Sequence, residues 1–210
     1  MARARTDAWL FFGDSVTLGV NDHAVLGGWT SRLVLGARDM GLCRIPPDTL
    51  YNLAARRQTA GAVAHRWRGE MASREMPGFA PRLAFCLGVV DVVAPGGGEP
   101  VPLETTMGDV AAILEEAVSL APTLLVAPPP VARAATLAGL RTLRDAQAEV
   151  CTRLGVPFAD VQDALAASPE YMDDLSDGLH PGPAGCALMA RLLLEIPCVR
   201  EFLRTVPRET

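Results

Sequence analysis

Two short segments, one near each end of the chain, carry the residue types that nucleophilic catalysis requires. Near the start, Ser15 follows Gly13 and Asp14, and near the end Asp177 stands three residues before His180. A serine hydroxyl is a weak nucleophile at neutral pH, so it needs an imidazole to take its proton and a carboxylate to orient that imidazole. The two segments therefore supply a candidate nucleophile, a candidate base and a candidate orienting acid.

Each segment alone is only weak evidence for a catalytic site. A Gly-Asp-Ser tripeptide is by default a turn at the end of a strand, and an Asp-Gly step followed by His-Pro is by default a surface loop. Asp173 and Asp174 are also rival partners for His180. The catalytic interpretation depends on finding both segments in one α/β chain, where their side chains can converge on one site.

On these residues the sequence resembles the SGNH subgroup of the GDSL-type esterases and lipases, over most of its length. That family carries its serine in a Gly-Asp-Ser segment after the first strand and an Asp-x-x-His near the last helix, which Ser15, Asp177 and His180 match. The same match favours Asp177 over Asp173 and Asp174. The resemblance implies a three-layer α/β/α sandwich with a central, mostly parallel five-stranded sheet of the flavodoxin-like kind. It implies no cofactor.

The resemblance also implies an oxyanion hole, and there the chain departs from the family. The family uses the serine N–H, the N–H of a glycine in a second block and an asparagine side chain in a third. Arg57 aligns with that glycine, and Val90 aligns with the asparagine. A backbone donor survives the first change, provided the turn does not need a positive φ, whereas valine donates nothing. Loss of one donor costs roughly 2.7 to 4 kcal/mol in dissected serine hydrolases.

Further polar residues beside these blocks complete the candidate substrate-binding set. Arg56 and Arg57 each offer a fork of donors that suits a carboxylate or phosphate, and either could replace the missing amide. Asp14 and Asn52 adjoin the same blocks, although such side chains more often hold a turn. The predicted oxyanion and substrate-binding residues are therefore Ser15, Arg57, Val90, Asp14, Asn52 and Arg56.

Three functions stay open at this point. The first is a serine-dependent hydrolase of acyl esters or thioesters with an atypical oxyanion hole, in which Ser15 attacks, His180 moves the proton and Asp177 orients His180. The second is a tailoring enzyme of secondary metabolism, which transfers an acyl group or catalyses a non-hydrolytic step. The third is a non-catalytic small-molecule binding protein. It ranks last, because a decayed enzyme has no reason to keep the three residues together.

Composition limits the alternatives. A chain of 210 residues with 50% apolar content predicts a single domain over residues 1–210. The net charge of −5 argues against a nucleic-acid partner, and there is no apolar run long enough to span a membrane. All 19 basic residues are arginines, which excludes lysine-dependent chemistry such as a Schiff base. The expected partner is a small acyl substrate, and the oligomeric state is left open.

The cysteines and the first residues point to a cytoplasmic protein. Five cysteines without paired spacing indicate reduced thiols, and three histidines without a Cys-x-x-Cys give no zinc site. The basic start leads into four strongly apolar residues, which is typical of a strand and not of a secretory signal.

Short apolar runs alternate with helical patterns, which predicts strands connected by crossover helices. The cluster Pro95 to Pro100 predicts a surface loop, with a mobile rim over the site as the alternative. The predicted strands are Ala8 to Phe12, Thr49 to Leu53, Arg82 to Leu87, Thr123 to Ala127 and Val156 to Ala159. The predicted helices are Trp29 to Met40, Ala60 to Ser73, Leu103 to Leu120, Val131 to Leu154 and Ala184 to Leu194.

Overall fold

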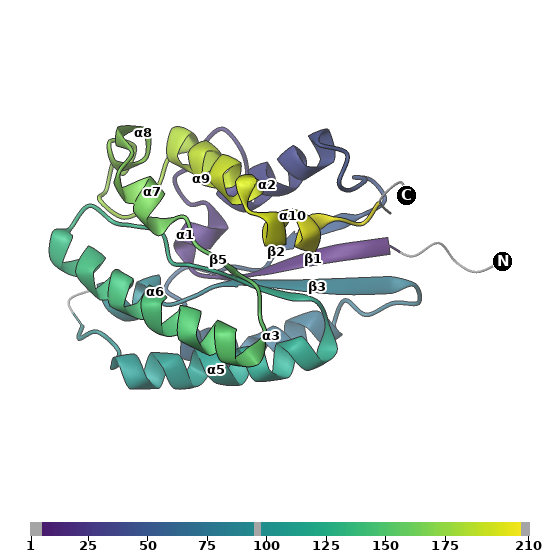
Figure 1. Ribbon diagram of the computed structural model, residues 1–210, viewed down its shortest axis with the longest axis horizontal. Coiled ribbons are helices and arrows are strands. Elements are labelled where there is room, and N and C mark those ends of the chain that lie inside the picture. The colour runs from purple at the N-terminus through teal and green to yellow at the C-terminus, as the bar shows by residue number, and fades with distance from the viewer. Residues whose placement is uncertain (1–5, 95–97, 207–210) are drawn as a thin grey trace.

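The computed structural model describes residues 6–94 and 98–206, and its centre is a five-stranded sheet (Figure 1). The strands run in the order β2-β1-β3-β4-β5, and every neighbouring pair is parallel. This confirms the predicted α/β/α class. The strands are β1 (Thr6–Gly13), β2 (Thr49–Asn52), β3 (Phe79–Cys86), β4 (Thr123–Val126) and β5 (Phe158–Ala159).

Helices cover both faces of the sheet (Figure 1). One layer consists of α3 (Ala60–Ala72), α5 (Leu103–Leu120) and α6 (Ala134–Leu154). The other holds α2 (Gly28–Asp39), α7 (Gln162–Ala166), α8 (Pro169–Met172), α9 (Pro183–Glu195) and α10 (Pro197–Leu203). Two short helices, α1 (Ser15–Leu18) and α4 (Val89–Val93), follow β1 and β3 almost directly.

The alternation of side chains along β1 divides the core between the two layers. Trp9 and Phe11 pack with α2 and α9, whereas Leu10 and Phe12 pack with α3 and α5. Successive side chains of a strand point to opposite faces, so a central strand covered on both sides is apolar at every position. β1 is buried from Asp7 to Gly13, which makes its carboxyl end a rigid place for a functional residue.

The predicted elements are present, but their bounds differ at several points. α6 begins at Ala134 and not at Val131, and β5 is reduced to two residues. β3 starts at Phe79, because Pro81 lies where β3 pairs with β1 alone and its missing N–H interrupts no second ladder. Helices of four to seven residues were not predicted, since they are too short to show a period. These are α1, α4, α7, α8 and α10.

Some predictions are not tested. Residues 95–97 of the predicted Pro95 to Pro100 loop and the first five residues lie outside the described part of the chain. The single domain over residues 1–210 also stays a prediction. All five cysteines are free, and four of them are buried.

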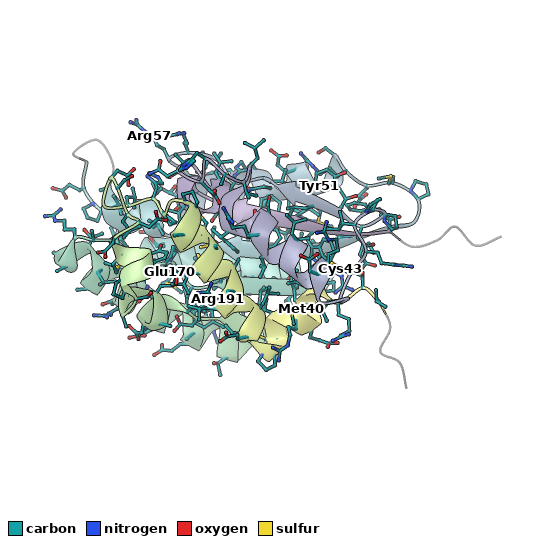
Figure 2. The ribbon with its side chains drawn as sticks, turned by 90° about the horizontal axis from the view of Figure 1, so that it is seen from above. Met40, Cys43, Tyr51, Arg57, Glu170 and Arg191 are labelled. Atoms are coloured by element: carbon teal, nitrogen blue, oxygen red, sulfur yellow. The ribbon has the colours of Figure 1, made fainter. Side chains whose placement is uncertain are left out.

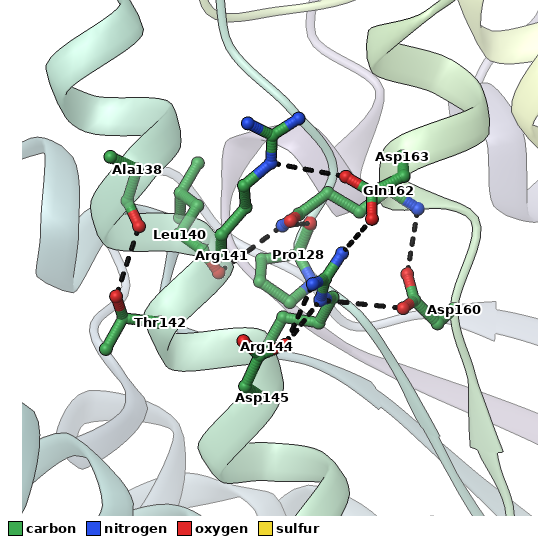
Figure 3. Close-up of polar contacts among 10 residues, drawn as sticks. All are labelled: Pro128, Ala138, Leu140, Arg141, Thr142, Arg144, Asp145, Asp160, Gln162 and Asp163. Carbon is green, nitrogen blue, oxygen red and sulfur yellow. Dashed lines mark hydrogen bonds and ion pairs between the residues drawn. The ribbon is translucent and has the colours of Figure 1, made fainter.

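A buried glutamine connects the end of β4 to the helices beside it (Figure 3). The fully buried Gln162 donates from Nε2 to the carbonyls of Pro128, at 2.7 Å, and Leu140, at 3.4 Å. The chain continues from Pro128 to Ala132, whose N–H donates to the Gly178 carbonyl at 2.9 Å. This network therefore supports the loop that carries Asp177 and His180.

We expect Gln162→Met to lower the free energy of unfolding by about 1 to 3 kcal/mol, because two buried carbonyls lose their donor. Urea unfolding followed by circular dichroism measures this change. The matched control is Arg141→Gln, which removes an exposed ion pair with Asp163 and should cost less than about 1 kcal/mol. Equal losses in the two variants would contradict a structural role for the buried amide.

Candidate active site

Ser15 is the first residue of α1, directly beyond the carboxyl end of β1. Asp14 begins the helix, since its Oδ1 accepts the Val16 N–H at 2.9 Å. Gly13 has no room for a side chain, because a Cβ there would lie 2.4 Å from Thr17 Oγ1 and 2.6 Å from the Cys86 carbonyl. The tight strand-to-helix turn therefore places the serine at the edge of the sheet where open α/β folds bind ligands.

The structure brings Ser15, His180 and Asp177 into one hydrogen-bonded chain. His180 Nε2 lies 2.7 Å from Ser15 Oγ, and His180 Nδ1 lies 2.7 Å from Asp177 Oδ2. This arrangement suits a neutral imidazole that donates from Nδ1 and accepts at Nε2. Ser15 is 8% exposed, so the hydroxyl is reachable while its surroundings are largely dry.

Asp177 is fixed by the backbone of its own loop. Its Oδ1 accepts the N–H groups of His180, at 2.8 Å, and Leu179, at 3.0 Å. Partial burial raises the pKa of Asp177, but the hydrogen bonds from the His180 backbone and ring and from Leu179 outweigh it and lower the pKa to about 2. The carboxylate is therefore ionised throughout the neutral range. Asp174, a rival of Asp177 as the partner of His180, instead accepts the Gly185 N–H at 2.7 Å.

Asn21 joins the two halves of this site and was not found from the sequence. Its Nδ2 lies 3.4 Å from Asp177 Oδ2, 3.3 Å from the His180 carbonyl oxygen and 3.5 Å from Ser176 Oγ. The contacts span more than half of the chain, so no local motif could have indicated them. Asn21 connects the segment after α1 to the loop that carries the histidine.

A cavity of about 230 Å³ opens beside Ser15. Its walls combine the serine and the histidine with two arginines and a set of apolar side chains. Among the predicted binding residues, Arg56, Arg57 and Val90 line it, whereas Asp14 and Asn52 do not. The full lining is Ser15, Arg56, Arg57, Val89, Val90, Val93, Leu179 and His180.

The two positions at which the sequence departs from the predicted oxyanion hole, Arg57 and Val90, both line this cavity. Arg57 has a φ of 60°, so the turn does require the left-handed conformation that glycine adopts freely. An L-residue there costs roughly 1–2 kcal/mol. The Arg57 side chain is exposed and extends from the edge of the molecule (Figure 2). Val90 lies in α4, and its apolar side chain forms part of the wall.

Asn52 serves the scaffold and not the cavity. Its Nδ2 donates to the Thr17 carbonyl and to Thr30 Oγ1, each at 3.0 Å, and its Oδ1 accepts the Ala54 N–H at 3.1 Å. These bonds connect α1 and the start of α2 to the end of β2. The amide is therefore engaged on both sides, which is why it does not reach the substrate region.

Asp14 and Asp91 are buried carboxyls beneath the site. Burial raises the pKa of Asp14 to about 6, although the N–H groups of Val16, Thr17 and Val90 act against it. Asp91 accepts the Ala60 N–H and the Thr106 hydroxyl, each at 3.0 Å, and burial raises its pKa as well. Both carboxyls hold helix starts.

A larger cavity of about 680 Å³ lies at the opposite end of the sheet, between β4, β5 and α10. None of the described residues that line it is a histidine, so it lacks the base that Ser15 has.

Within residues 6–94 and 98–206, no three His, Cys, Asp or Glu side chains gather as a metal site. No described helix is both long and apolar enough to cross a membrane. The cytoplasmic location and the lack of a nucleic-acid partner stay predictions.

Comparisons with known proteins identify the family and the fold. Residues 11–188 match the model of the GDSL-like lipase/acylhydrolase family. Similar solved structures include a lipase/acylhydrolase from Enterococcus faecalis, with 21% identity and a TM-score of 0.75 over 94% of this chain and 96% of that one. An acetylxylan esterase from Geobacillus stearothermophilus has 17% identity and a TM-score of 0.72, over 98% and 100%. At these identities the structures establish a shared fold. A comparison with curated proteins finds no match.

We expect Asp14→Asn to make the protein more stable at neutral pH. Between the unfolded pKa of 3.8 and the folded pKa of about 6, the folded protein binds more protons than the unfolded chain, so this group makes stability fall as pH rises. The full loss is at most about 3 kcal/mol, and asparagine retains an acceptor for the Val16 N–H. Urea unfolding at several pH values between 4 and 7 should show a stability gain that grows with pH. Parallel curves for variant and wild type would refute this account.

Proposed function

The chain belongs to the GDSL-like lipase/acylhydrolase family, and from this premise we propose that it is a serine esterase that cleaves short acyl esters or thioesters. The observation that carries the proposal is the chain of contacts from Asp177 through His180 to Ser15, with 2.7 Å at each step. A nucleophile in contact with a base, and a base in contact with an orienting acid, is the arrangement that acyl transfer through serine requires.

In the proposed mechanism Ser15 Oγ attacks the carbonyl carbon while His180 Nε2 accepts the hydroxyl proton. The tetrahedral intermediate then expels the alcohol or thiol, to which His180 returns the proton, and an acyl-serine ester remains. Water attacks this ester, His180 again takes a proton, and the acid leaves as Ser15 recovers its hydrogen. Asp177 stays ionised throughout and stabilises the imidazolium.

The backbone N–H groups of Ser15 and Arg57 are the proposed donors to the oxyanion. Neither N–H donates a hydrogen bond to another described residue, so both are free to bind substrate. The third donor of the family is replaced by Val90. The proposed esterase therefore works with a weakened oxyanion hole unless a guanidinium of Arg56 or Arg57 contributes.

The size and the walls of the cavity favour a substrate with a small acyl group. Its volume of about 230 Å³ lies below the usual range for drug-sized ligands, and three valines and Leu179 make it apolar. Val90 also favours a second candidate function, a tailoring enzyme that transfers the acyl group to another acceptor or catalyses a step with less oxyanion charge. A binding protein without turnover is the alternative from another class.

We expect Ser15→Ala to abolish both labelling by a serine-directed fluorophosphonate and hydrolysis of p-nitrophenyl acetate, with circular dichroism unchanged. Labelling with turnover in the wild type supports the esterase, and labelling without turnover supports transfer to another acceptor. The matched control is Ser119→Ala, because Ser119 is exposed on α5 and should be dispensable. A wild type that shows neither labelling nor turnover would favour the binding protein or a non-covalent reaction.

We expect Val90→Asn to raise kcat for p-nitrophenyl acetate by about tenfold to a hundredfold, because the amide restores a third donor to the oxyanion. The gain stays below the cost of deleting such a donor, since the wall is packed around an apolar side chain. Val118→Asn, an exposed valine on α5, controls for the chemistry of the substitution. If kcat stays at background while labelling persists, the cavity is remodelled for another reaction.

A further inference from the structure

We propose that the natural substrate is an anionic ester, with a carboxylate or phosphate near the scissile bond that Arg56 and Arg57 bind. This inference rests on the proposed esterase function and adds the class of substrate. Arg56 and Arg57 line the same cavity as Ser15 and His180. Two arginines therefore border the cavity that the proposed nucleophile opens into, and both are exposed, so their long side chains are accessible to a substrate.

The first argument is that the side chains of these two arginines have no hydrogen-bond or ion-pair partner among residues 6–94 and 98–206. Twelve of the sixteen described arginine side chains contact a carboxylate or a backbone carbonyl, as in the bidentate pair of Arg32 with Asp22. The exceptions among the described residues are Arg44, Arg56, Arg57 and Arg133. Acidic residues outnumber basic ones in this chain, 24 to 19, so a shortage of carboxylates does not explain the exceptions.

The second argument is that none of the described residues that line the cavity carries a carboxylate. Its walls are two arginines, the serine, the histidine and apolar side chains. The buried acids nearest in sequence to the lining residues, Asp14 and Asp91, are committed to helix starts. Arginine forks bind carboxylates and phosphates through paired hydrogen bonds, so an anion from the substrate is the partner that this site lacks.

The third argument is the backbone of Arg57. Its φ of 60° is the conformation that glycine adopts without strain, and a glycine would supply the same N–H to an oxyanion. An arginine in this conformation carries an energetic cost that the backbone donor alone does not justify. Its guanidinium is the feature that glycine cannot provide.

The test compares matched esters that differ in charge. The first pair is 4-acetoxybenzoate and neutral 4-acetoxybenzamide, which put the charge on the alcohol side. The second is monoethyl glutarate and ethyl pentanoate, which put it on the acyl side. We expect kcat/KM to favour the anionic member of at least one pair by about tenfold, and added salt to reduce this preference. The pair that shows it identifies where the anion lies.

The double variant Arg56→Gln/Arg57→Gly should bring this ratio close to one, because it removes both guanidiniums and leaves a residue suited to the turn. Arg44→Gln is the matched control, since Arg44 is exposed and unpaired but precedes β2 at the opposite end of the sheet. A guanidinium that served only as an oxyanion donor would affect kcat/KM equally for the anionic and the neutral ester. An unchanged ratio in the double variant would therefore overturn the proposal.

Binding to Ser15→Ala separates this inference from the proposed function. NMR titration of that variant should show tighter binding of 4-acetoxybenzoate than of 4-acetoxybenzamide, with the difference lost when Arg56 and Arg57 are also replaced. Equal binding, or turnover of neutral esters without any preference, overturns the anionic substrate and leaves the esterase intact. Preferential binding of the anion without fluorophosphonate labelling of the wild type overturns the esterase and leaves the anion site.

Discussion

The hydrogen bond between His180 and Ser15 joins residues 165 positions apart, and much of the fold serves to make this contact possible. β1 delivers the serine from the middle of the sheet, whereas the histidine arrives in the loop before α9. The apolar contact between α2 and α9 brings the two together, since Trp29 and Leu33 pack in one cluster with Cys186 and Met189. Because α9 begins just after His180 and α2 is the helix that follows α1, which begins at Ser15, their packing holds both ends of the hydrogen bond.

The sequence was sufficient for the parts of the site that are encoded locally. Ser15, Asp177 and His180 could be named because their neighbours form recognisable motifs, and the sheet could be predicted because its strands are continuous apolar runs. Asn21 could not, because its partners are distant in sequence and its own neighbourhood resembles an ordinary turn. One-turn helices such as α1 and α4 were missed for a related reason, since their boundaries depend on capping and tertiary contacts. Asn52 was assigned to the site because it adjoins a block of the sequence motif, but its amide donates to the Thr17 carbonyl and to Thr30 Oγ1 instead.

The two departures from the family pattern, Arg57 and Val90, lie on the walls of the same cavity. An asparagine amide is a directional donor that acts over one hydrogen-bond length. A guanidinium on a long side chain acts over a greater distance and responds to total charge more than to the exact position of an oxygen. If these residues bind the substrate as proposed, the exchange at this cavity replaces short-range stabilisation of the transition state with longer-range attraction.

The loop of residues 177–180 holds Asp177 and His180, the proposed acid and base, in one hydrogen-bonded unit. Both oxygens of Asp177 bind groups of this loop, through the Leu179 and His180 N–H groups and the His180 ring. A displacement of the loop would therefore carry the two side chains together and leave their mutual geometry intact. The distance from His180 to Ser15 then becomes the one coordinate that separates an assembled site from a disassembled one.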